Sequence, residues 1–309
     1  MSSELTDVVV FDRVDKRYGG VVALREMSAT VGRGEMFGLI GPDGAGKTTM
    51  IRLACGLIRP ERGAVRVLGR DPAAEHAAIT GEIGYLSQRF SLYGDLSIDE
   101  NLAFFAEIHG VADYRERRDR LLEMTQLAPF RRRLADRLSG GMKQKLALAC
   151  TLIHEPTLLL LDEPTTGVDP VSRREFWKLL SAFLSQGVTI VMTTPYVDEA
   201  ERCTRVALIH DGRALAVDTP TRLRAELPGQ VIEVVAEPSG LAAAVLRQAP
   251  GVDEVQAFGE RIHARLDPRS APEAIDRLRA LLVTSGIVDP ALRPVPTSLE
   301  DVFIARIAR

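Results

Sequence analysis

Residues 41–48 form a glycine-rich segment that ends in a lysine and a threonine, matching the pattern G-x-x-x-x-G-K-[ST]. Glycines let backbone N–H groups approach an anion closely, and the N-terminus of a following helix favours negative charge. An apolar stretch at 35–40 precedes the segment and a helical pattern at about 47–56 follows it, as phosphate binding requires. We therefore predict a phosphate-binding loop, in preference to a simple turn before a helix. The predicted nucleotide contacts are Gly41, Pro42, Asp43, Gly44, Ala45, Gly46, Lys47, Thr48 and Thr49.

Lys47 and Thr48, at the end of this loop, carry side chains suited to phosphates and to the metal that accompanies them. The Lys47 ammonium would bring a positive charge to the β- and γ-phosphates, so it is a catalytic as well as a binding candidate. The Thr48 hydroxyl is a candidate ligand for Mg²⁺, which prefers oxygen donors. The loop therefore predicts ATP and Mg²⁺ as the groups bound.

A second candidate site follows four consecutive leucines at 158–161, where Asp162 and Glu163 stand next to each other. The leucines predict a buried strand, and ligands of open α/β sheets bind at the carboxyl ends of the strands. We predict that Asp162 holds Mg²⁺ through water and that Glu163 orients or deprotonates the attacking water. The alternative is a pair of carboxylates capping a helix, which the presence of the phosphate-binding loop disfavours.

The segment Leu-Ser-Gly-Gly-Met-Lys-Gln-Lys at 138–145 resembles the signature of ABC ATPases, which separates that family from other proteins with the same phosphate-binding loop. Ser139, Gly140 and Gly141 would begin a helix and so provide a second anion-binding N-terminus. The resemblance implies that these residues meet the γ-phosphate held by the other subunit of a head-to-tail pair. A serine cap with flexible glycines describes the same local structure but leaves the combination of motifs unexplained.

Three further segments resemble elements of this family, and the resemblance covers about residues 8–220. It implies that Gln88 joins the two lobes of the ATPase and senses Mg²⁺ and the attacking water. It also implies that residues 167–169 cross the dimer interface. Tyr18 is the candidate for stacking on adenine, although a tyrosine beside a turn can also serve only in packing.

One position departs from the family pattern, in which Thr-Thr-His-x-x-x-Glu-Ala follows the third strand. Residues 193–200 read Thr-Thr-Pro-Tyr-Val-Asp-Glu-Ala, so Pro195 stands where the family has a histidine that donates to the γ-phosphate. Proline has no side-chain donor and no backbone N–H. The loss of one transition-state donor typically costs about 10²–10³ in rate. We therefore expect ATP to bind and to be hydrolysed slowly at this chain's own site, while its signature can complete the site of a partner.

The alternation of apolar strands with helices predicts an α/β fold of the P-loop NTPase type with a mainly parallel sheet. We assign residues 1–225 to the nucleotide-binding domain, with a helical lobe at about 90–155 that includes a helical region at 98–128. The pattern changes near 219–229. Residues 226–309 read as βαββαβ with an added helix behind a Ser298 cap, which predicts a small ferredoxin-like α+β domain.

Two details resemble drug-exporter ATPases in particular. Residues 296–303 resemble the ending of exporter ATPases of the daunorubicin-resistance type. The loop sequence Gly-Pro-Asp-Gly-Ala-Gly-Lys with a switch position other than histidine resembles the N-terminal ATPase half of tandem drug-exporter subunits. The resemblance implies an ATP-binding subunit that dimerises around ATP and drives a substrate through separate integral-membrane subunits. With one such half in the chain, we expect a second ATPase subunit as partner, or a homodimer.

Composition limits the partners and the location. The net charge is −3, without the basic excess of a dedicated nucleic-acid binder, so we expect no nucleic-acid partner. The first ten residues do not resemble a secretory signal, and no apolar run approaches the length of about 18 residues that spans a bilayer. We expect a cytoplasmic protein, peripheral on the inner face of the cell membrane through membrane subunits.

Two rival functions stay open from the sequence alone. Pro195 is compatible with a degenerate regulatory subunit that binds ATP as the partner of a second ATPase, although Glu163 argues against a full loss of catalysis. A soluble ABC ATPase of translation or DNA repair is the other rival. The translation type usually fuses two ATPase domains, and the repair type inserts long coiled coils between the loop and the signature; neither feature occurs here.

Overall fold

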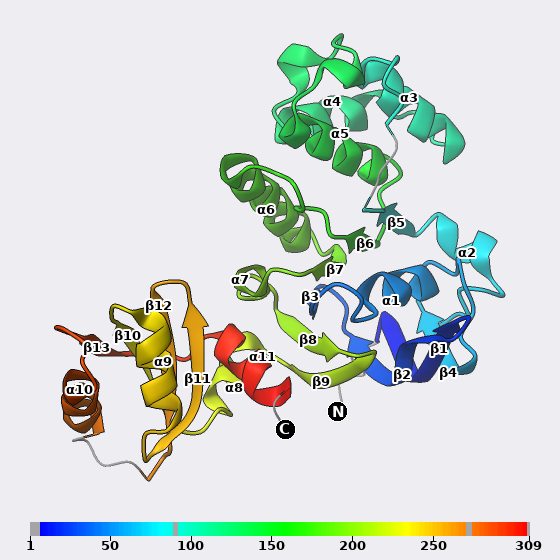
Figure 1. Ribbon diagram of the computed structural model, residues 1–309. Helices are drawn as coiled ribbons and strands as arrows, with labels where there is room; N and C mark the ends of the chain where they lie inside the picture. Colours follow the sequence, from blue (N-terminus) through cyan, green and yellow to red (C-terminus); the bar gives the residue numbers. More distant parts are fainter. Residues whose placement is uncertain (1–6, 89–91, 270–273, 308–309) are drawn as a thin grey trace. The chain divides into compact units, whose positions relative to one another are not determined.

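The computed structural model describes residues 7–88, 92–269 and 274–307 (Figure 1). The chain divides into two compact units, Met1–Pro220 and Thr221–Arg309. Each unit has its own hydrophobic core. Among the residues described, no helix is both long enough and apolar enough to cross a membrane.

The larger unit is built on a central sheet whose strands are paired in the order β5-β6-β7-β3-β8-β9. The first five strands are parallel, and β9 pairs antiparallel at one edge. The strands β3, β6 and β7 are buried along their whole length, which explains the apolar runs in β3 and in the first four residues of β6; β7 contains three buried threonines. The bounds are β5 Ile83–Leu86, β6 Leu158–Asp162, β7 Thr189–Thr194, β3 Met36–Ile40, β8 Arg205–His210 and β9 Arg213–Asp218.

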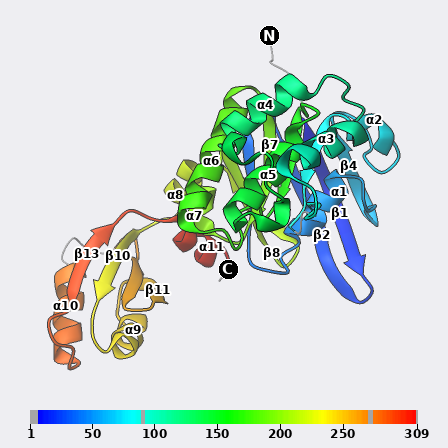
Figure 2. The same cartoon turned by 90° about the horizontal axis from the view of Figure 1, so that it is seen from above.

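Helices pack on this sheet, and a second, antiparallel sheet joins the core. Both α1 and α6 contact β7, and Figure 2 shows them on opposite sides of it. The second sheet has the strand order β2-β1-β4. The bounds are α1 Lys47–Ala54, α2 His76–Thr80, α6 Pro170–Ser185, α7 Val197–Ala200, β1 Val9–Tyr18, β2 Val21–Val31 and β4 Arg62–Val67. The predicted P-loop NTPase fold with a mainly parallel sheet is confirmed.

The helical lobe contains α3 (Ile98–Ile108), α4 (Arg115–Met124) and α5 (Gly140–Leu152). A reciprocal pair of hydrogen bonds between Ser97 and Glu100 caps the start of α3. The helical region expected at 98–128 is wrong as a continuous element, because Gly110 adopts a φ of 67° and ends the first helix there. The strands β5 and β9 and the helix α2 were not predicted.

The smaller unit begins with α8 (Pro220–Ala225), after which the elements have the predicted ferredoxin-like order. Its four strands are paired antiparallel in the order β11-β12-β10-β13. One face of the sheet packs against α9 and α10 through an apolar core that includes Ile232, Val234, Ile262 and Leu246. The bounds are β10 Gln230–Val235, α9 Ser239–Arg247, β11 Val252–Phe258, β12 Arg261–Leu266, α10 Ala274–Thr284, β13 Ala291–Val295 and α11 Leu299–Ile307.

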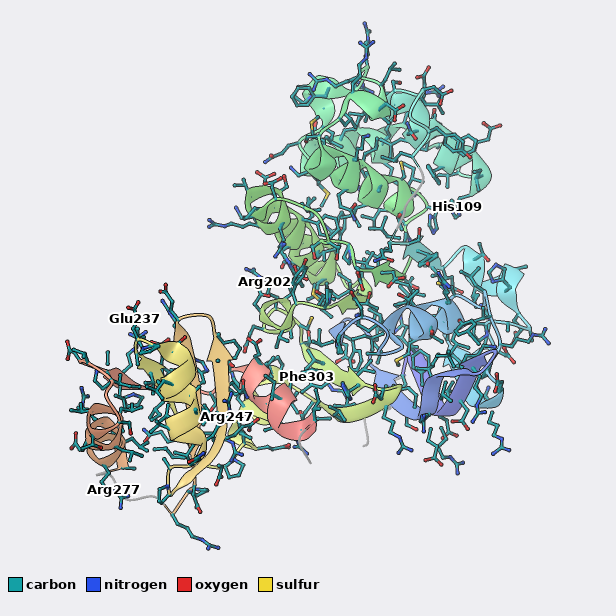
Figure 3. The ribbon with its side chains drawn as sticks, viewed as in Figure 1. His109, Arg202, Glu237, Arg247, Arg277 and Phe303 are labelled. Carbon is teal, nitrogen blue, oxygen red and sulfur yellow. The ribbon has the colours of Figure 1, made fainter. Side chains whose placement is uncertain are left out.

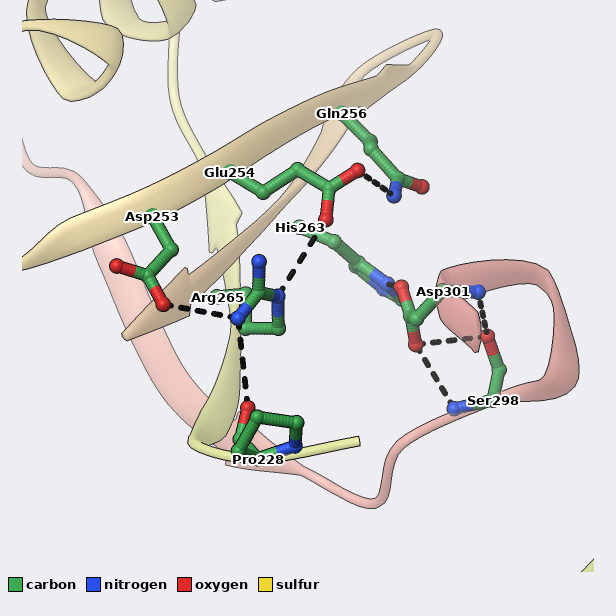
Figure 4. A network of polar contacts seen from close by, with 8 residues as sticks. All are labelled: Pro228, Asp253, Glu254, Gln256, His263, Arg265, Ser298 and Asp301. Atoms are coloured by element: carbon green, nitrogen blue, oxygen red, sulfur yellow. Dashed lines mark hydrogen bonds and ion pairs between the residues drawn. The ribbon is translucent and has the colours of Figure 1, made fainter. Parts of the chain in front are cut away.

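The other face of this sheet carries polar side chains that hold the start of α11 (Figure 4). Ser298 caps the helix, since its hydroxyl accepts from the backbone N–H of Asp301, as predicted. The Asp301 carboxylate accepts in return from the Ser298 backbone N–H at 2.8 Å, and its other oxygen lies 3.0 Å from His263 Nδ1 on β12. Nearby, Arg265 pairs with Asp253 and Glu254. The capping carboxylate therefore ties α11 to the sheet.

We predict that Asp301→Ala loosens α11 and destabilises the smaller unit by about 2–3 kcal/mol, because the partly buried donors on Ser298 and His263 lose their buried acceptor. Urea unfolding and hydrogen exchange of the α11 amides measure the two effects. Glu300→Ala is the control, since Glu300 lies one position earlier in the same helical turn and is exposed. Equal loss of protection in both variants would contradict the role given to Asp301.

Candidate functional site

The glycine-rich loop connects the carboxyl end of β3 to the start of α1, as predicted. Gly44 and Gly46 have φ values of 82° and 106°, a region that favours glycine. A Cβ atom added at Gly46 would stand 2.5 Å from the Ala23 carbonyl oxygen, and one at Gly41 would collide with the carbonyl of Ile209. The loop thus needs glycine for its shape and for its close contact with neighbouring backbone.

The Lys47 side chain lies inside this loop and is only 3% exposed. Its Nζ donates to the carbonyl oxygens of Gly41 at 2.8 Å and Pro42 at 3.0 Å. It also lies 3.4 Å from Glu163 Oε1 and 3.9 Å from Asp43 Oδ1. The backbone of the loop therefore holds the lysine beside Glu163, one of the two predicted carboxylates.

The Asp162 carboxylate lies across from the start of α1, at the carboxyl end of β6. Its Oδ1 accepts from Thr48 Oγ1 at 3.0 Å and from Thr193 Oγ1, on β7, at 2.7 Å. Asp162 is 2% exposed. Thr193 was assigned no role from the sequence, where it counts only as the first residue of the segment compared with the family pattern.

Glu163 comes directly after β6 and adopts a φ of 48°, which is uncommon for a residue other than glycine. Its backbone N–H donates to Thr193 Oγ1 at 2.8 Å. Its Oε2 accepts from Gln88 Nε2 at 2.9 Å and from Thr166 Oγ1 at 3.4 Å. The structure thus brings Gln88 and Glu163 together, although they lie far apart in the sequence.

A pocket of about 380 Å³ contains most of these groups. Tyr18, at the end of β1, lines the pocket and is 44% exposed, and the Lys16 amine lies 5.7 Å from the centre of its ring. The predicted residues that line this pocket are Tyr18, Asp43, Gly44, Gly46, Lys47, Thr48, Thr49, Gln88 and Glu163. Val21, Val22 and Ala23 of β2 also line it and were missed, because a β-strand pattern carries no sign of a ligand.

Ser139, Gly140 and Gly141 are not among the residues that line this pocket. Ser139 caps α5, since its hydroxyl accepts from the Met142 backbone N–H at 3.4 Å. Ser139 and Gly140 are exposed, whereas Gly141 packs against the side chain of Ser172 on α6. The signature segment therefore presents a solvated helix start away from the loop of its own chain.

Pro195 lies in the short connection between β7 and α7. The next residue, Tyr196, stacks its ring on the Arg173 guanidinium at 4.8 Å. Glu199, which is 1% exposed, accepts from the Thr165 hydroxyl at 2.8 Å. The loop after β7 is thus fixed by contacts to α6 and to the segment after β6.

A second pocket of about 210 Å³ is lined in part by His109 and His154. The two rings stack with centroids 3.8 Å apart. Figure 3 labels His109 among the side chains of the larger unit. Burial, and to a lesser extent the neighbouring His109, lowers the pKa of His154 to about 4, so this imidazole is neutral at pH 7. Within the described part of the chain, no group of three or more His, Cys, Asp or Glu side chains could hold a metal ion.

The comparisons with known proteins agree with this geometry. The family model described as ABC transporter matches residues 24–166. The chain is 37% identical over 301 residues to the daunorubicin resistance ATP-binding protein DrrA3 of Streptomyces coeruleorubidus, covering 96% of this chain and 92% of that protein. The chain belongs to the ATP-binding proteins of ABC transporters.

Other relatives of this ABC ATPase are similar over the same range. The probable multidrug ABC transporter ATP-binding protein YbhF of Escherichia coli K12 is 37% identical over 303 residues, which are 96% of this chain. The chain spans about half the length of that relative, 51%. A solved structure of the ATP-binding subunit of an ABC transporter is 30% identical, with a TM-score of 0.65, covering 71% of this chain and 92% of that one. The resemblance to the drug-exporter branch is thus confirmed.

We predict that Gly46→Ala weakens ATP binding at least tenfold and destabilises the larger unit, because its Cβ would press on the Ala23 carbonyl. Gly44→Ala is the control: that residue also has a positive φ, but a Cβ there meets nothing within 4 Å. ATP titration calorimetry and thermal unfolding measure the two effects. If both variants behave alike, backbone strain and not the contact with Ala23 governs the loop.

Proposed function

We propose that the chain is the ATP-binding subunit of an exporter-type ABC transporter. In this proposal, ATP-driven dimerisation and hydrolysis move a substrate through separate integral-membrane subunits, which also hold the chain at the inner face of the cell membrane. The observation that carries the proposal is the convergence of Lys47, Gln88 and Glu163 on one pocket that is also lined by Tyr18. The names of the relatives, which refer to multidrug transport and daunorubicin resistance, favour export.

In this proposal the pocket binds the phosphates of ATP and its adenine through different groups. The glycine-rich loop and the start of α1 would hold the phosphates, with the Lys47 ammonium as the positive charge closest to them. The exposed ring of Tyr18, which also lines the pocket, offers a flat apolar surface for the adenine. The remaining assigned contacts are Gly41, Pro42, Asp43, Gly44, Ala45, Gly46, Thr48 and Thr49.

The donors near Thr48 fit Mg²⁺. The Thr48 hydroxyl, the Asp162 carboxylate and the Gln88 side-chain oxygen are hard oxygen donors of the kind that this ion prefers. A single carboxylate is enough when the nucleotide supplies phosphate oxygens. Mg²⁺, when bound with ATP, would neutralise charge that develops on the phosphates.

Glu163 is the candidate for orienting and deprotonating the attacking water, and Gln88 is the candidate for positioning both. The hydrogen bond from Gln88 Nε2 to Glu163 Oε2 fixes the direction of that carboxylate. Pro195 offers no donor at the position that the family gives to histidine, so we propose that hydrolysis at this site is slow.

We predict that purified protein binds MgATP but turns over slowly, and that Pro195→His raises the steady-state ATPase rate by about 10-fold or more, because one donor to the transition state is restored. ATP affinity should change little. Pro195→Ala serves as the control, since it removes the proline ring without adding a side-chain donor. Rapid turnover of the unmodified chain, unimproved by Pro195→His, would overturn the proposed impairment.

The signature segment supports a dimer as the working unit. Ser139 and Gly140 are exposed and lie outside the pocket of their own chain, so a second subunit is needed to bring such a segment to the nucleotide. The partner can be a second copy or a different ATPase subunit. Nothing in the charge balance of −3 favours a nucleic-acid partner.

We predict that Glu163→Gln converts the chain to a stable dimer in MgATP, because ATP then binds without being cleaved. Adding Ser139→Glu should abolish that dimer, since a carboxylate would face the partner's γ-phosphate. Adding Gln186→Glu instead introduces the same charge at another exposed position and should leave the dimer intact. Light scattering with and without MgATP measures the mass; a monomer in every case would argue for a different ATPase subunit as the partner.

A regulatory role is the second candidate function, and Pro195 is the observation that favours it. In that case the chain binds ATP and completes the active site of a catalytic partner through Ser139, Gly140 and Gly141, while its own turnover is negligible. The ATPase rate of the Pro195→His variant separates the two, because a merely impaired site recovers and a degenerate one does not.

A further inference from the structure

We propose that Thr193 is a positioning residue for the hydrolysis of ATP, acting on both carboxylates of the site through one hydroxyl group. The inference rests on the proposed function, because it assigns a role within the same site. Asp162 and Thr193 are direct neighbours across the parallel strands β6 and β7. The Thr193 hydroxyl contacts both the Asp162 side chain and the Glu163 backbone.

The direction of these hydrogen bonds is fixed. The Glu163 backbone N–H can only donate, so the Thr193 oxygen accepts that bond, at 2.8 Å. The hydroxyl proton is then directed to Asp162 Oδ1, 2.7 Å away. Thr193 is fully buried, so water does not compete for either bond. One hydroxyl group therefore links the backbone of Glu163 to the carboxylate of Asp162 through two hydrogen bonds.

This arrangement selects one oxygen of Asp162. Oδ1 accepts from both Thr193 and Thr48, whereas Oδ2 accepts from no residue that the structure describes. Two donors on one oxygen hold the carboxylate in a single orientation and leave the second oxygen for a further partner. In the proposed function that partner would be water held by Mg²⁺. Thr193 thus prepares Asp162 for its role without touching the nucleotide.

The same hydroxyl holds the turn that aims Glu163. Glu163 has a positive φ, and such conformations persist where surrounding contacts determine them. Its N–H would be buried without an acceptor if the Thr193 oxygen were absent. The turn places the Glu163 carboxylate against Gln88 and Lys47. Loss of the hydroxyl would therefore displace the proposed base as well as Asp162.

The strand itself does not need this hydroxyl. Valine has nearly the same shape as threonine and fits a buried strand at least as well. Thr189, at the other end of β7, provides a matched comparison: it is 1% exposed, and its hydroxyl accepts from one backbone N–H, that of Gly34, at 2.9 Å. Thr189 has no contact with the site. Thr189→Val therefore shows the effect of losing a buried hydroxyl alone, without the loss of hydrogen bonds to Asp162 and Glu163.

The test compares Thr193→Val, Thr193→Ser and Thr189→Val in the full chain. We expect Thr193→Val to lower the single-turnover rate of ATP hydrolysis by about 10–100-fold, the range for a lost hydrogen bond to a charged group. It should also reduce the gain in ATP affinity on adding Mg²⁺, measured by calorimetry with ATP in EDTA and in Mg²⁺. Affinity in EDTA should stay within about twofold. Thr193→Ser should restore both quantities, and Thr189→Val should change neither, even where melting temperatures fall equally.

Two results would overturn the inference: wild-type hydrolysis and Mg²⁺ dependence in Thr193→Val, or equal losses in Thr189→Val. The calorimetry decides the question even if turnover of the unmodified chain is too slow to follow. Failure of the proposed function is seen separately, since the unmodified chain would then bind no ATP in either buffer.

Discussion

Asp162 is a carboxylate buried at the end of the central sheet, and a buried charge is tolerated only where donors surround it. Here the donors come from two other segments, Thr48 after β3 and Thr193 on β7. The donors reach Asp162 because β7 stands between β6 and β3 and the three strands end at the same level. The carboxylate, the glycine-rich loop and the turn at Glu163 are consequently parts of one arrangement, and none can shift alone.

Local patterns determined much of what could be predicted. The strand β3 and the first four residues of β6 are apolar, and each run leads into a motif with a distinct spacing, so sequence and structure agree there. Gln88 and Tyr18 were proposed only by resemblance, and the structure places both at the pocket. The contacts of Thr193 and of the β2 residues were missed, because they arise where strands far apart in the sequence come together. The break between α3 and α4 depends on the backbone conformation at Gly110, which an amphipathic pattern does not encode.

The smaller unit was predictable in its order of elements and less so in its contacts. Alternating apolar residues identify the sheet face that packs on α9 and α10. The pattern does not predict the contacts on the opposite face, because His263 and Asp301 are 38 residues apart in the sequence. There the Asp301 carboxylate both caps the start of α11 and contacts His263 on the sheet, so one side chain joins the helix to the sheet (Figure 4).

The ion pair between Lys47 and Glu163 has a consequence for the order of events. In this structure the group that would act on water and the group that would receive the phosphate neutralise each other at 3.4 Å. An arriving phosphate competes for the ammonium and so releases the carboxylate. Before nucleotide binds, the ion pair with Lys47 compensates the negative charge of the buried Glu163 carboxylate. The carboxylate would become free to act on water only when a phosphate takes its place beside Lys47.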